Sequence, residues 1–84
     1  MSTNIYVGNL SFSTTSASLR TLFAQYGEVT TAQVVEDRDT GRSRGFGFVE
    51  MPSAEEAQKA ISATDGKALD GRQLKVNLAR PRSG

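Results

Sequence analysis

The 84-residue sequence contains no cysteine, no histidine and no tryptophan. Without cysteine there can be no disulfide, and without cysteine and histidine the common zinc sites are excluded. The usual catalytic bases and thiol nucleophiles are also missing, and the carboxylates form no coherent pair. We therefore expect a protein that is not an enzyme and that needs neither a metal nor a cofactor.

Long apolar runs and a strong net charge are absent as well. No run approaches the ~20 apolar residues that span a bilayer, and the N-terminal segment MSTNIYVGNL lacks the features of a signal peptide. The net charge is only +1, so attraction to a polyanion would depend on where the charges lie. The length suits one domain, expected over residues 1–79, followed by a short basic tail over 80–84.

Periodicity of the apolar residues predicts two helices and four strands. The first helix ends near Gly27 and has an apolar stripe of Leu19, Leu22, Phe23 and Tyr26. Ser53 and Glu56 form a capping-box signature at the start of the second helix. Alternating, β-rich segments predict strands over 4–10, 29–37, 42–51 and 73–79, with a small hairpin around Asp70-Gly71.

This order of elements is β-α-β-β-α-β, which predicts the α+β class and a ferredoxin-like fold. Two helices would then cover one face of a four-stranded antiparallel sheet. The opposite face would stay open to water.

The segment RSRGFGFVEM, residues 42–51, is unusual for a strand with one buried face. Residues two apart share a face of a strand, so Phe46 and Phe48 share a face with Arg44 and Glu50. Together with Tyr6 of the first strand, the two phenylalanines would lie on the open face.

Three aromatic rings on an open sheet suggest a platform on which nucleobases stack. We expect Gly8 to leave room there for a base or sugar. We expect Gly45 and Gly47, on the inner face, to let a helix pack close to the strand.

Two short segments resemble the RNA recognition motif (RRM) family. IYVGNL (5–10) resembles its hexamer motif, and RGFGFVEM (44–51) resembles its octamer motif, K/R-G-F/Y-G/A-F-V-x-F/Y. The octamer departs from the pattern at Met51, where the family has Phe or Tyr. By alternation Met51 faces the core, so we expect the change to affect packing and not the binding face. The resemblance extends from about Asn4 to Ala79.

The resemblance implies a binder of single-stranded RNA. Tyr6 and Phe46 would stack on bases, and Arg44 would pair with a phosphate. Phe48 would pack against a sugar or between two residues of the bound strand. Further contacts are implied for residues that border the platform or follow the last strand: Asn9, Gln33, Val35, Arg42, Lys75, Asn77, Arg80 and Arg82. Glu50 would repel a phosphate. The family analogy also suggests a monomer in the cytoplasm, acting in RNA chaperoning or post-transcriptional regulation.

Other interpretations stay open at this point. Single-stranded DNA could occupy the same face, because only contacts to the 2′-hydroxyl exclude it. The chain's own C-terminal tail or a partner protein could instead cover Phe46 and Phe48. Arg72 is expected to be a surface residue of the small hairpin, although a phosphate contact there is conceivable.

Overall fold

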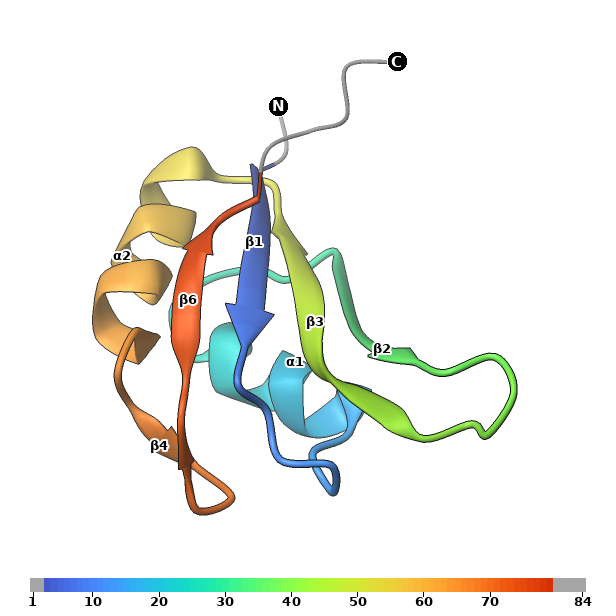
Figure 1. Cartoon of the computed structure of the whole chain (residues 1–84). Helices are drawn as coiled ribbons and strands as arrows, with labels where there is room; N and C mark the ends of the chain where they lie inside the picture. The colour runs from blue at the N-terminus through green and yellow to red at the C-terminus, as the bar shows by residue number, and fades with distance from the viewer. Residues whose placement is uncertain (1–2, 80–84) are drawn as a thin grey trace.

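The computed structural model describes residues 3–79 (Figure 1). In chain order the elements are β1 (Thr3–Gly8), α1 (Ser16–Ala24), β2 (Thr31–Glu36), β3 (Ser43–Met51), α2 (Ala54–Thr64), β4 (Ala68–Leu69), β5 (Arg72–Gln73) and β6 (Lys75–Leu78). This is the predicted order, with the small β4–β5 hairpin inserted before the last strand.

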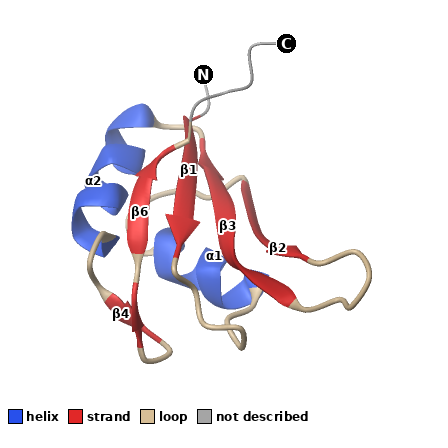
Figure 2. Ribbon diagram, viewed as in Figure 1, coloured by secondary structure: helices blue, strands red, loops and turns tan. Residues whose placement is uncertain are grey.

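The main sheet has four strands in the order β2-β3-β1-β6, and each neighbouring pair is antiparallel. Both helices lie on the same side of this sheet (Figure 2). Within residues 3–79 no element covers the opposite face. The expected ferredoxin-like architecture is confirmed.

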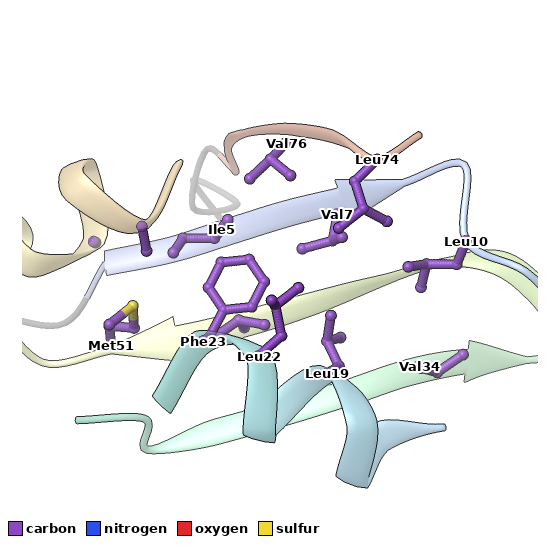
Figure 3. Close-up of a cluster of buried hydrophobic side chains, with 13 residues drawn as sticks. Ile5, Val7, Leu10, Leu19, Leu22, Phe23, Val34, Met51, Leu74 and Val76 are labelled. Atoms are coloured by element: carbon purple, nitrogen blue, oxygen red, sulfur yellow. The ribbon is translucent and has the colours of Figure 1, made fainter. Parts of the chain in front are cut away.

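The core fills the space between the sheet and the two helices (Figure 3). The strands contribute alternate residues, among them Ile5 and Val7 of β1. Met51 is fully buried there, as the alternation of β3 predicted. Thr64 is fully buried too, and its hydroxyl donates a 2.6 Å hydrogen bond to the carbonyl of Ala60, which satisfies the polar group.

Each helix begins at a side-chain cap. The Thr15 hydroxyl accepts a hydrogen bond from the N–H of Ser18, and the Ser53 hydroxyl accepts one from the N–H of Glu56. The Glu56 carboxylate does not complete the predicted capping box. It accepts a hydrogen bond from the N–H of Glu28, at 3.4 Å, and so ties α2 to the segment that follows α1.

The glycines of β3 have a different role from the one expected. A Cβ atom at Gly47 would meet backbone atoms of Gln33 and Val34 in β2, so the close approach is between strands. Gly45 has φ +84° and lies against the carbonyl of Leu10. The expectation that these glycines make room for a helix is therefore wrong.

The β4–β5 hairpin turns at Asp70 and Gly71, as predicted. Their φ angles of 51° and 84° are those of a type I′ turn. The Asp70 carboxylate also accepts a 2.7 Å hydrogen bond from the hydroxyl of Thr14, which is almost fully buried. This bond fixes the hairpin to the loop that precedes α1.

Candidate nucleic-acid interface

Three aromatic side chains gather on the open face of the sheet, as expected. Tyr6 pairs with Phe48 across the β1–β3 register, and Phe46 lies opposite Gly8. The ring centroids are 5.9 Å apart for Tyr6–Phe46, 5.9 Å for Tyr6–Phe48 and 6.0 Å for Phe46–Phe48. We call these three residues the aromatic platform.

The platform remains accessible although its rings touch one another. Phe48 is 41% exposed, and Tyr6 and Phe46 are half-buried. Tilted and edge-on aromatic contacts are favourable and hold the rings in place. Their remaining exposed faces can receive a flat, unsaturated ring.

Gly8 shapes the platform from below. A Cβ atom at Gly8 would lie 2.6 Å from the hydroxyl of Tyr6 and 2.8 Å from its ring. The tyrosine ring therefore lies over Gly8, which is buried beneath it. The Tyr6 ring itself occupies the space that we expected a base or sugar to use. Because Gly8 has no side chain, it leaves room for this ring.

Polar residues extend the platform to both edges of the sheet. Residues directly opposite one another on antiparallel strands share a face. The register therefore forms one row of Gln33, Phe48, Tyr6 and Asn77 across all four strands, and a second row of Phe46, Gly8 and Lys75. Three of the predicted contact residues, Gln33, Lys75 and Asn77, are thus brought next to the rings, and all three are exposed. Glu50 occupies the neighbouring row, opposite Asn4 and Thr31.

Asn9 and Arg72 form a connection that the sequence did not reveal. The Asn9 side chain donates to the carbonyl of Gln73 at 2.6 Å and accepts from the guanidinium of Arg72 at 2.8 Å. The amide that was expected to contact RNA is thus engaged within the protein. It holds Arg72 beside the end of β1 instead. The two residues are 63 positions apart, and no local pattern predicts this contact.

The arginines near the start of β3 lie beside an ordered turn. The Asp37 carboxylate accepts backbone hydrogen bonds from Asp39 at 2.8 Å and from Thr40 at 3.2 Å. These bonds hold the pKa of Asp37 below its usual value, and the positive charge of Arg44 acts in the same direction. Arg42 and Arg44 are exposed.

The assignment of Arg44 to the open face depended on unbroken alternation. The register shifts between Val34 and Glu36, opposite the start of β3, and Gly45 has a positive φ. Regular alternation therefore holds only from Phe46 onward. Arg80 and Arg82 lie outside the described residues.

One exposed aromatic residue lies outside the platform. Phe12, in the loop between β1 and α1, is 74% exposed. Sequence reasoning passed over it because a single aromatic residue in a loop belongs to no periodic face. Across residues 3–79 there is no cluster of acidic side chains placed to hold a metal ion, and no helix long and apolar enough to cross a membrane.

Comparison with known proteins gives a consistent result. A family model described as the RNA recognition motif matches residues 5–75. The chain is 57% identical to the putative RNA-binding protein RbpE of Nostoc, over 94% of this chain and 80% of the relative. It is 53% identical to the mitochondrial glycine-rich RNA-binding protein 4 of Arabidopsis thaliana, over 99% of this chain but only 61% of the relative. A crystal structure titled RNA Binding Protein PG1 superposes with a TM-score of 0.92 at 48% identity, covering 98% of this chain and 99% of the other.

Proposed function

The chain belongs to the RNA recognition motif family, and we propose that it binds single-stranded RNA on the open face of its sheet without catalysing a reaction. The observation that carries the proposal is the aromatic platform. Three rings within about 6 Å of one another lie on the face that neither helix covers. Stacking of a base on such a ring is worth about 1–3 kcal/mol.

The residues around the platform suggest how the protein holds a strand of RNA. Bases stack on Tyr6 and Phe46, and Phe48 packs against a sugar. Asn77 and Gln33, at the two ends of the same row, have amide groups that can pair with base edges. Lys75, Arg42 and Arg44 supply cations for phosphates. Glu50 repels phosphate. The phosphate backbone of the RNA therefore passes on the other side of the platform, along the row of Phe46, Gly8 and Lys75.

Arg72 joins the phosphate contacts in this proposal. Its hydrogen bond to Asn9 fixes the guanidinium near the end of β1, and its other N–H groups, which bond to no residue between 3 and 79, can donate to an anion. Asn9 then acts by positioning Arg72 rather than by touching RNA.

A backbone-amide NMR titration tests the proposal directly. Short single-stranded RNA of random sequence is added to the protein, and DNA of the matching sequence is added in a parallel experiment. We expect shifts in residues 5–9, 44–50 and 75–78. A larger effect with RNA would show that the 2′-hydroxyl is read. Absence of shifts with both nucleic acids would assign the platform to a partner protein instead.

The two phenylalanines of β3 provide the matching mutational test. Replacing Phe46 and Phe48 by alanine should weaken RNA binding at least about tenfold, because two stacking surfaces are lost. Both side chains lie on the uncovered face, so the fold should survive, and circular dichroism would verify this. Unchanged affinity in a folded double variant would contradict the proposal.

Three further expectations, on the oligomeric state, the cellular role and the location of the protein, belong to the same proposal. We expect a monomer, which sedimentation analysis would test. RNA chaperoning or post-transcriptional regulation is suggested by family analogy alone. A cytoplasmic location also stays a prediction, because one relative is named as mitochondrial and others belong to cyanobacteria. Fractionation of source cells would decide it.

A further inference from the structure

The side chain of Glu50 lies on the same face of β3 as the platform rings, two residues beyond Phe48. It is half-buried, and between residues 3 and 79 no side chain forms a hydrogen bond or an ion pair with its carboxylate. The octamer pattern leaves this position free, so membership of the family does not account for a glutamate here. On a face that binds RNA, a carboxylate that repels phosphate calls for another explanation.

Glu50 is close enough to the platform to reach a bound base. Residues two apart on one face of a strand are separated by about 6.5 Å, which is the spacing of Glu50 from Phe48 along β3. Tyr6 is the partner of Phe48 in the β1–β3 register, so Glu50 is its diagonal neighbour. Such neighbours are about 7–8 Å apart, a distance that long side chains bridge. The carboxylate can therefore meet the edge of a base that stacks on the Tyr6 ring.

Charges of opposite sign lie at the two ends of the platform. Lys75 lies in the row of Phe46, and Arg72 is held near the same end of β1. Glu50 lies at the opposite end, in the row beyond Phe48. A nucleotide carries its negative charge on the phosphate and presents hydrogen-bond donors on the edge of its base. The charges therefore favour a strand whose phosphates lie at the Lys75 end and whose base edges point toward Glu50.

Guanine is the base whose edge matches a carboxylate. An ionised carboxylate only accepts hydrogen bonds, and its two oxygens can accept side by side. Guanine presents two adjacent donors on its Watson–Crick edge, the N1–H and the N2 amino group. Adenine and cytosine present one amino group beside a ring nitrogen that accepts, and uracil presents one N–H between two carbonyls. In these three bases an acceptor would face the carboxylate, which is unfavourable.

Asn4 lies directly opposite Glu50 and complements it. The two residues are partners in the β1–β3 register, so their Cβ atoms lie about 4.5–5.5 Å apart. The Asn4 side chain is exposed, and its amide N–H groups can donate to the O6 carbonyl of guanine. Because O6 adjoins N1 on the same edge of the base, both side chains can bind one guanine together.

We propose that Glu50, assisted by Asn4, selects guanine for the nucleotide that stacks on Tyr6. Glu50 accepts from N1–H and from the N2 amino group, and Asn4 donates to O6. This inference rests on the proposed function, because the platform must hold the base before its edge is read. It assigns the base preference of this chain to two residues outside the aromatic platform.

Fluorescence anisotropy with labelled oligouridine RNAs tests this selection. One RNA carries guanosine at its centre, one carries inosine, which lacks only the N2 amino group, and one carries adenosine. The unaltered protein should bind the guanosine RNA at least about fivefold more tightly than the inosine RNA, because one charge-assisted hydrogen bond is lost. Against the adenosine RNA the difference should be at least about tenfold. Equal affinity for the guanosine and inosine RNAs would overturn the proposal.

Glu50→Gln is the decisive variant. Glutamine keeps the shape of the side chain, but its amide nitrogen would face one of the two guanine donors. The guanosine and inosine RNAs should therefore bind to this variant with affinities within about twofold of each other. Affinity for plain oligouridine should stay the same or rise, because a charge that repels phosphate is gone. Circular dichroism verifies the fold, and a guanosine preference that persists in the folded variant would overturn the proposal.

Glu55→Gln is the matched control. Glu55 is exposed on α2, which lies on the covered side of the sheet, and its replacement removes the same charge from the molecule. This variant should prefer guanosine as strongly as the unaltered protein does. An equal loss of preference in both variants would trace the effect to net charge and overturn the proposal.

Failure of this inference differs from failure of the proposed function. If the unaltered protein binds all of the RNAs equally, and Phe46→Ala/Phe48→Ala abolishes this binding, the proposed function stands without base selection. If the unaltered protein binds none of the RNAs, the proposed function itself fails.

Discussion

Tyr6 and Gly8 act together at the scale of single residues. The tyrosine ring lies over the glycine, and a Cβ atom there would approach the ring to less than 3 Å. Both residues belong to the IYVGNL segment, so the sequence indicated their importance. It did not indicate that the glycine supports an aromatic ring of the protein itself, because only the side-chain conformation of Tyr6 reveals this.

Replacing Gly8 by alanine should therefore lower RNA affinity by up to about tenfold, because the Tyr6 ring must tilt away from the sheet. The clash involves the end of a side chain that can move, so thermal denaturation should show a nearly unchanged stability. The same substitution made in a Tyr6→Leu background should have little further effect on affinity. Equal losses in both backgrounds would show that Gly8 contacts the RNA directly.

At the scale of the elements, hydrogen bonds join two loops that are far apart in the sequence and hold them beside the sheet. The loop after β1 and the β4–β5 hairpin are joined by the bond between Thr14 and Asp70 and by the bonds of Asn9. The hairpin itself was predicted from Asp70-Gly71, since that dipeptide favours a type I′ turn. Its attachment to the loop was not predicted, because the partners lie 56 to 64 positions apart.

A double-mutant cycle measures this attachment. Asp70→Gly keeps the positive φ of the turn but removes the carboxylate, and Thr14→Ala removes the hydroxyl. We expect a coupling free energy of about 1–2 kcal/mol from urea denaturation, as for a partly shielded hydrogen bond to a charged group. A coupling near zero would mean that the hairpin is held by packing alone.

At the scale of the whole molecule, the two faces of the sheet have separate tasks. The two helices cover one face around a single core (Figure 2). The other face carries the aromatic platform. Met51 belongs to the sealed face although it ends the segment that carries Phe46 and Phe48. The departure from the octamer pattern at this position is therefore a matter of packing.

Met51→Ala should lower the free energy of unfolding by about 2–5 kcal/mol, because it leaves a cavity in the core. Met51→Leu should cost less than about 1.5 kcal/mol. Both variants should bind RNA with unchanged affinity under conditions in which they are folded. Weaker RNA binding by fully folded Met51→Leu would show that the two faces are coupled.

The sequence by itself determined the order of elements, the two faces of the strands apart from the start of β3, and the platform residues, because these follow from local periodicity and turn chemistry. It also predicted Gln33, Lys75 and Asn77 correctly as residues of the open face. Only the tertiary structure decided that Asn9 holds Arg72, that Gly47 accommodates the backbone of β2, and that Phe12 stands exposed. These features arise from contacts between segments far apart in the chain, and no periodic pattern encodes which of them meet.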